Sequence, residues 1–245
     1  MENFLLSVPL ASGIITGHCL TLDGLLGGIV FRRTGDVAAA RDGLPLARSH
    51  GVYHGSAVML EYPCRIDRHM INASFVAEAR RDPSFAHKVR PNKPGKPLLK
   101  IDGKRGEFKT DTSEYQVHQT TAVHFLGRGD VAAIRRLMVS VAYIGTKRSH
   151  GYGQIARPTD SNSGHVRFEI DGVDQDNPWF GIFSQGHVLR PVPVRLLPDF
   201  GVTPQKYRTS HETWRNPYRD AEGRESCVVP AGNIRHASQI RQLCV

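Results

Sequence analysis

The sharpest local feature of this sequence lies between Ile144 and Ile155, which reads IGTKRSHGYGQI. It combines glycines with cations, hydrogen-bonding groups and one aromatic ring: Gly145, Lys147, Arg148, Ser149, His150, Gly151, Tyr152 and Gly153. Glycine allows positive φ angles, and freed amide groups beside two cations can cradle a phosphate. A tight helix-to-strand connection with exposed cations explains the spacing equally well. The pattern is neither a Walker A loop nor a dinucleotide fingerprint, because it has no GxxxxGK[ST] and no strand leads into it.

A second candidate is the basic window from residue 80 to residue 109. It holds ten Lys and Arg against three acidic residues and so carries +7 of the net charge of +9. Its predicted RNA-contacting members are Lys93, Lys96, Lys100, Lys104, Arg105 and Lys109. Interspersed prolines and glycines exclude a long helix. A basic arm that follows a phosphate backbone and a solvated loop that aids solubility both fit, and the neutral residues 160–245 favour the arm.

The histidines offer a third kind of chemistry. The chain has twelve of them, and His18 facing His50 or His54 could act as a metal-free general acid and base. Half-exposed structural histidines are the more ordinary reading, since so many histidines produce pairs by chance. Other catalytic patterns are missing from the sequence. Asp171, Asp174 and Asp176 lack the spacing of a calcium loop, and there is no GxSxG.

Composition limits the class of protein. The chain has 245 residues, of which 40% are hydrophobic and 22% charged, as in globular proteins. The four cysteines show no CxxC spacing, so we expect neither a disulfide framework nor a metal or other cofactor. No run approaches the roughly 20 apolar residues of a membrane span, and the first residues do not resemble a signal peptide. A cytoplasmic protein with a polyanionic partner and no membrane is therefore expected.

Hydrophobic periodicity predicts the elements that position these groups. We expect strands at 3–10, 51–61, 122–126 and in QIARP before Pro158, with a further strand-like segment at 165–170. Thr21 should cap a helix over 22–33, and Asp130 should cap a second helix that ends at Gly145. Frequent prolines after residue 170 predict short strands and long loops.

The order of these elements predicts an α+β fold. Strand, helix, strand, basic insertion, strand, helix, strand is the βαββαβ plan of a ferredoxin-like, RRM-like domain with an inserted arm. We expect this domain over residues 1–158, with the insertion at about 76–118. Residues 159–245 should form an irregular, mostly β C-terminal part packed on the first domain. Antiparallel sheets of this kind often bind RNA.

Three segments resemble one known group of proteins. IGTKRSHGYGQI is similar to the glycine-rich loop that follows the second helix in the RAMP superfamily of CRISPR-associated proteins. LDGLLGGIVFRR at 22–33 and PLARSHGVYHGSAV at 45–58 resemble the first helix and following strand of the same proteins. Together they are most similar to the guide-end-capping subunit of type IV CRISPR effector complexes. The resemblance covers about residues 1–158, and beyond that only the proline-rich LRPVPV at 189–194 fits.

The resemblance implies a noncatalytic subunit that binds the 5′ handle of the guide RNA and caps the backbone filament. The glycine-rich loop would line the handle, and the basic window would correspond to the thumb that kinks the RNA. His18 and Arg48 complete the predicted RNA-binding set. The implied partners are guide RNA and other effector subunits, above all the backbone subunit, and contact of the arm with target DNA stays open. Some RAMP relatives cut precursor RNA, so a metal-independent endoribonuclease is the alternative.

Overall fold

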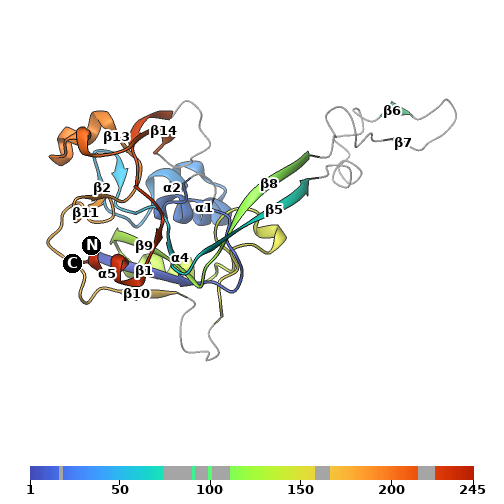
Figure 1. Cartoon of the computed structure of the whole chain (residues 1–245), viewed down its shortest axis with the longest axis horizontal. Helices are drawn as coiled ribbons and strands as arrows, with labels where there is room; N and C mark the ends of the chain where they lie inside the picture. The colour runs from blue at the N-terminus through green and yellow to red at the C-terminus, as the bar shows by residue number, and fades with distance from the viewer. Residues whose placement is uncertain (17–18, 74–89, 92–98, 101–110, 158–165, 215–223) are drawn as a thin grey trace. The chain divides into compact units, whose positions relative to one another are not determined.

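The computed structural model of this chain describes residues 1–16, 19–73, 90–91, 99–100, 111–157, 166–214 and 224–245. These residues divide into two compact units. The larger unit comprises Met1–Ile66 and His118–Val245, and the smaller comprises Asp67–Val117. Figure 1 traces the chain through its helices and strands. The fold is mixed α+β, as the sequence predicted, with a five-stranded sheet in the larger unit.

Five strands form the main sheet in the order β10-β1-β9-β4-β16. Their bounds are Arg167–Glu169 (β10), Glu2–Pro9 (β1), Ala122–Gly129 (β9), Met59–Glu61 (β4) and Ile234–Arg235 (β16). Neighbouring strands are antiparallel except β16, which runs parallel to β4. Phe4, Leu6 and Val8 alternate along β1 and are fully buried on one face, which confirms the predicted first strand.

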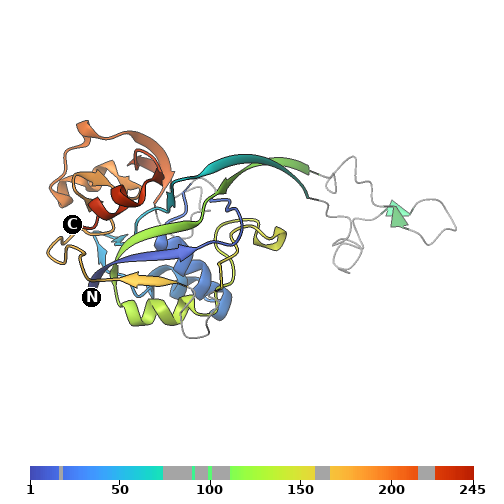
Figure 2. The same cartoon turned by 60° about the horizontal axis from the view of Figure 1, so that its bottom comes forward.

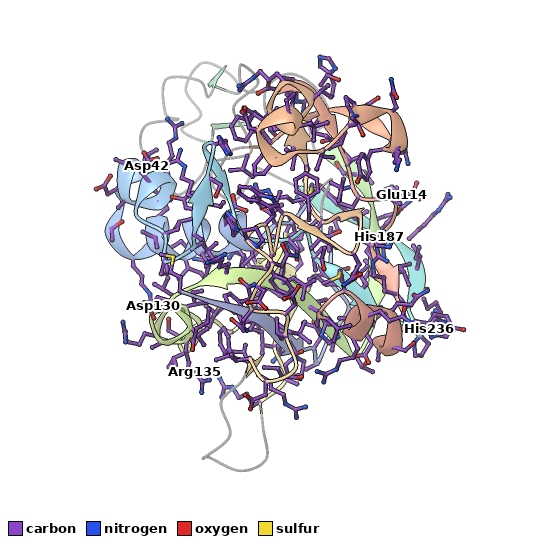
Figure 3. All side chains as sticks on the ribbon, turned by 90° about the vertical axis from the view of Figure 1, so that its left-hand side faces the viewer. Asp42, Glu114, Asp130, Arg135, His187 and His236 are labelled. Atoms are coloured by element: carbon purple, nitrogen blue, oxygen red, sulfur yellow. The ribbon has the colours of Figure 1, made fainter. Side chains whose placement is uncertain are left out.

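Two helices, α1 (Leu22–Thr34) and α4 (Val131–Met138), cover that face of the sheet (Figure 2). The predicted caps are confirmed, because the Thr21 side chain accepts from the Gly24 amide and Asp130 accepts from the Ala133 amide. Leu22, Leu26, Ile134 and Met138 pack with the buried strand residues in one cluster. Figure 3 shows the side chains on the ribbon, with Arg135 of α4 and Asp130, the residue that caps this helix, among those labelled.

The opposite face of the sheet is partly covered by the short helix α5 (Ala237–Gln242) (Figure 2). Ile240 and Leu243 pack there against Leu5, Met59 and Leu126 in a separate buried cluster. The outer side chains farther along β1 are not part of this cluster. Next to α5 the polar side chains of Ser7 and His124 instead line a groove.

The rest of the larger unit consists of short elements, which were predicted for the C-terminal part but also occur between α1 and β4. They are α2 (Val37–Asp42), β2 (Arg48–Ser49), β3 (Val52–Tyr53), β11 (Phe183–Ser184), β12 (His187–Val188), β13 (Val192–Pro193), β14 (Thr209–Thr213), β15 (Arg224–Val228) and three 3₁₀ helices, Arg148–His150, Val194–Phe200 and Pro204–Lys206. The strands pair as β2-β3, β11-β12 and β13-β15-β14. A third buried cluster lies here, with Ile182, Val192, Leu197 and Trp214 among its members.

The smaller unit is built on two strand pairs. The strand β5 (Arg65–Ala73), which begins at the end of the larger unit, pairs with β8 (Asp111–Gln119). The strand β6 (Arg90–Pro91) pairs antiparallel with β7 (Leu99–Lys100). Most of the basic window lies outside the described residues.

Three predicted elements were wrong in their extent. The second helix ends at Met138 and not at Gly145, because the Val141 amide turns back to the Met138 carbonyl and the Arg33 guanidinium donates to the Leu137 carbonyl. Residues 51–61 are not one strand, since the amides of Ser56 and Ala57 bond different partners, Leu126 and Leu189.

The third error concerns the strand after α4. Gln154 and Ile155 make only isolated bridges, to Tyr143 and Leu10, and the strand that pairs with the outer edge of β1 is β10. Among the described residues, no helix is long and apolar enough to cross a membrane.

Candidate nucleic-acid interface

The glycine-rich loop, residues 144–155, is fixed to the segment that follows β1. Ile144 and Ile155 are buried in the main core at either end of the loop. Three backbone hydrogen bonds tie the loop down: Thr146 N to Ile15 O, Gly153 N to Gly13 O and Ala11 N to Gln154 O, each 2.8 Å. The loop therefore has a rigid base made of backbone pairing and buried isoleucines.

Two glycines of the loop are required by close packing. Gly153 has φ +71°, and a Cβ there would lie 1.9 Å from the Ile144 carbonyl oxygen. Gly145 has φ +82°, and its Cβ would lie 2.6 Å from the Ile15 carbonyl oxygen. Gly151, with φ +85°, has open space around it. Gly145 thus lets the loop approach the segment after β1, and Gly153 lets the two ends of the loop approach each other. Gly151 only makes a turn possible.

The tip of the loop presents polar groups to solvent. Arg148–His150 form a single 3₁₀ turn preceded by Lys147, which adopts the left-handed region at φ +54°. Arg148, Ser149 and His150 are exposed, and the Ser149 hydroxyl lies 3.2 Å from His150 Nδ1. Lys147 and Tyr152 are half-buried. The fold therefore gathers the predicted loop residues at one exposed tip, where cations and hydroxyl and imidazole groups can meet an anionic ligand.

Arg48 lies elsewhere. It is in the β2-β3 hairpin, where it pairs with Asp42 at 2.8 Å and lies 5.2 Å above the Tyr53 ring. The adjacent Ala47 amide bonds Arg128 at the far end of β9, which pairs with the beginning of β1. The glycine-rich loop contacts the segment after the end of β1. Arg48 is therefore separated from the loop by the length of that strand, about 20 Å for its rise per residue.

The other predicted contacts cannot be placed. His18, Lys93, Lys96, Lys104, Arg105 and Lys109 lie outside the described residues, and Lys100 is described only through the backbone of β7. Their roles stay predictions.

His54 is a structural histidine in this fold. It is 1% exposed, with Nδ1 3.1 Å from the Phe180 carbonyl oxygen and Nε2 2.8 Å from Ser49 Oγ. Burial lowers its pKa to about 4. A pair of His18 and His54 could not reach an RNA backbone through this residue. His50 is exposed, packed edge-on against Phe200.

A groove on the side of the main sheet that α5 covers in part was missed by sequence reasoning. Its volume is about 640 Å³, and its floor includes Ser7 of β1, His124 of β9 and Glu61 of β4. Ser7 Oγ lies 2.9 Å from His124 Nδ1, and Glu61 Oε2 lies 3.3 Å from His124 Nε2. No local pattern connects these three side chains, because they come together only through the pairing of the strands.

The described residues contain no group of three or more His, Cys, Asp or Glu side chains arranged to hold a metal ion. The four cysteines are free thiols. Burial raises the pKa of the Cys227 thiol to about 12 and that of Cys244 to about 11, so neither is an activated nucleophile.

No protein-family model matches the chain, and a search of curated proteins gives no match.

Proposed function

We propose that this protein is a noncatalytic RNA-binding subunit of a type IV CRISPR effector complex, which holds the 5′ handle of the guide RNA and caps the backbone filament. The observation that supports it most is the exposed tip of the glycine-rich loop, Lys147 to His150, on a base held by buried isoleucines and backbone hydrogen bonds. A rigid base matters because a preorganised site loses less conformational entropy when RNA binds.

We further infer a ferredoxin-like core. The strands β10, β1, β9 and β4 are neighbours in that order and alternate in direction. The helix α1 lies between β1 and β4 in the chain, and α4 lies between β9 and β10. This is the connectivity expected of a βαββαβ domain whose second and third strands are separated by an insertion. It supports the resemblance to RAMP proteins, in which the loop follows the second helix.

The proposed mechanism is positioning without bond cleavage. Lys147 and Arg148 would bind phosphates of the handle, and Ser149 and His150 would donate or accept hydrogen bonds from sugar or base. Tyr152 would offer a ring for stacking. The basic window would follow the phosphate backbone where the handle meets the guide, and the remaining surface would contact the backbone subunit.

The test removes the two cations of the tip. We expect Lys147→Ala with Arg148→Ala to weaken binding of a single-stranded repeat-handle RNA about tenfold or more, because two phosphate contacts are lost. Fluorescence anisotropy at several salt concentrations measures this, and the salt dependence should become shallower. The same variant should lose guide RNA when the effector complex is purified.

The matched control is Arg32→Ala with Lys206→Ala, which removes the same charge from two exposed positions that are not part of the loop. If both double variants lost RNA affinity equally, the effect would come from the net charge of the protein and not from the loop. That result would contradict the proposal. The alternative, endoribonuclease activity, predicts specific cleavage of repeat RNA by the wild-type protein in EDTA.

A further inference from the structure

The sheet-face groove has the shape and charge of a ligand site. Its volume of about 640 Å³ is in the range of small-molecule sites. Its floor is the row Ser7, His124 and Glu61, and α5 forms one wall. In the register of the sheet Arg167 and His124 lie opposite Ser7 on its two sides, so a polar row crosses β10, β1 and β9. Met59 is the β4 residue opposite His124, and Glu61 reaches the His124 ring diagonally from the end of β4.

Of the four described arginines that line the groove, Arg157 and Arg167 are the ones that could bind an anion. Glu169 is paired with Arg241, and Arg135 lies 5.2 Å above the Phe168 ring (Arg135 is labelled in Figure 3). Arg157 and Arg167 are exposed and have no acidic or aromatic partner among the described residues. Within the described part of the chain the groove therefore offers two guanidinium groups that no carboxylate pairs with, and guanidinium is well suited to phosphate oxygens.

The floor offers hydrogen-bond acceptors. The pKa of His124 is lowered by burial, so its ring is neutral near pH 7 and has one N–H. The Glu61 carboxylate cannot donate, so His124 donates to it from Nε2 and accepts at Nδ1 from the Ser7 hydroxyl. The lone pairs of Ser7 and the second oxygen of Glu61 remain for N–H groups of a ligand.

The groove also lies close to the glycine-rich loop. Arg157 lines both the groove and a smaller hollow of about 260 Å³, whose other walls include Tyr143 and Gln154 at the base of the loop. Arg157 is six positions after Gly151, which follows the tip, so the two are at most about 22 Å apart along the chain. A strand of RNA bound at the tip could therefore continue into the groove within a few nucleotides.

We propose that the sheet-face groove is a second RNA contact, which holds one nucleotide of the strand bound at the glycine-rich loop. The phosphate lies against Arg157 and Arg167, and an amino group of the base donates to Ser7 and Glu61. The proposal rests on the proposed function in one respect, that the ligand is a single-stranded RNA.

The test measures the affinity of a fluorescein-labelled twelve-nucleotide oligo(C) RNA. We expect Arg157→Ala with Arg167→Ala to weaken binding about tenfold and to make the salt slope shallower by about 1.4, the value for two phosphates on a single strand. Arg157→Lys with Arg167→Lys should keep most of the affinity, and Arg32→Ala with Lys206→Ala should keep nearly all of it. Thermal unfolding checks that each variant is folded.

A second measurement tests the base contact. Cytosine presents an amino donor where uracil presents a carbonyl, so oligo(C) should bind severalfold more tightly than oligo(U), and Glu61→Gln should narrow that difference. In addition, photo-cross-links from an RNA that contains 5-iodocytidine, which keeps the amino group, should map to peptides with Ser7 or His124. An equal affinity for oligo(C) and oligo(U) with no cross-links there would overturn the base contact.

The outcomes separate this proposal from the function it rests on. If Lys147→Ala with Arg148→Ala loses RNA while the groove variant binds normally, the groove proposal fails and the loop remains. If only the groove variant loses RNA, the groove proposal is supported and the proposed role of the loop is contradicted. If neither loses RNA, both are overturned. If free CMP binds as tightly as oligo(C), the groove is a mononucleotide site, and the proposed strand contact is wrong.

Discussion

His54 illustrates how burial decides the chemistry of a single side chain. Its ring is nearly inaccessible and both nitrogens are within hydrogen-bonding distance of protein groups, Ser49 Oγ and the Phe180 carbonyl oxygen. Burial lowers its pKa to about 4, and burial also lowers the pKa of His118 and of His124. These rings are neutral in the folded protein near pH 7. Protonation of the unfolded chain therefore opposes folding in mild acid.

We expect the free energy of unfolding to fall as the pH is lowered from about 6.5 to about 4. In this window the unfolded His54 binds a proton that the folded one does not, so His54 alone contributes a slope of up to about 1.4 kcal/mol per pH unit. Urea unfolding at successive pH values measures it. His54→Gln should be less stable at pH 7 but should show a shallower slope. An unchanged slope would mean that His54 does not titrate as its burial requires.

Sequence reasoning could identify chemical types but not their burial. The twelve histidines look alike in the sequence, and only tertiary packing separates buried His54 from exposed His50 and His150. The cations of the loop were recognised because they are adjacent in the chain. Ser7, His124 and Glu61 were not connected, because their proximity depends on the pairing of three strands far apart in the sequence.

The glycine-rich loop shows what a backbone segment needs in order to serve as a support. Gly145 and Gly153 permit carbonyl oxygens of neighbouring segments to approach where a side chain would collide. The loop then pairs with residues after β1 and holds its tip at a fixed place. The rigidity that the proposed function requires thus comes from the glycines as well as from the buried isoleucines.

Two alanine substitutions separate these roles. Gly151→Ala should cost about 1–2 kcal/mol, the price of left-handed backbone alone. Gly153→Ala should cost more, because its Cβ would lie 1.9 Å from the Ile144 carbonyl oxygen and the loop would have to move. We expect Gly153→Ala to weaken RNA binding more than Gly151→Ala, by anisotropy, with stability followed by urea unfolding. Equal effects of the two substitutions on both measurements would argue against a packed base.

The elements themselves were predicted well where local signals are strong. Thr21 and Asp130 each cap the helix expected of them, and the alternation of Phe4, Leu6 and Val8 identified β1. Helix ends and edge strands were predicted less well. The side chain that binds the last turn of α4, Arg33, belongs to another helix. The strand β10 pairs with Leu5–Ser7 at the edge of β1, whereas Ile155 only bridges Leu10 beyond its end. Such competition depends on distant parts of the chain.

Across the larger unit, one buried ion pair joins the N-terminal and C-terminal parts. Arg190 is fully buried and binds Asp23 in the first turn of α1 through two contacts of 2.9 and 3.2 Å. Its guanidinium also donates to the carbonyl oxygens of Tyr53 and Trp214. These groups are brought together by one side chain from the proline-rich LRPVPV segment. No local pattern in the sequence indicates that Arg190 binds Asp23.

Breaking that pair should affect the whole larger unit. Asp23→Ala leaves a buried guanidinium without its carboxylate, and we expect a loss of about 3–5 kcal/mol in the free energy of unfolding. Asp42→Ala is the matched control, because Asp42 pairs with Arg48 at the surface with its side chain 55% exposed, and its loss should cost less than about 1 kcal/mol. Urea unfolding compares the two. Similar losses of unfolding free energy in both variants would contradict the claim that burial makes the Asp23–Arg190 pair the more costly one to break.

The composition of the main sheet has a consequence for how the chain folds while it is made. β1, β4 and β9 are complete by residue 129, but β16 and α5 follow about a hundred residues later. At ribosomal speeds of about 5–20 residues per second, that delay is about 5–20 s. During this time β16 does not yet pair with the edge of β4, and α5 does not yet pack on the sheet. The nascent chain therefore exposes an unpaired strand edge that is prone to aggregation. A chaperone, or an RNA strand that binds early, would have that interval in which to bind the exposed sheet.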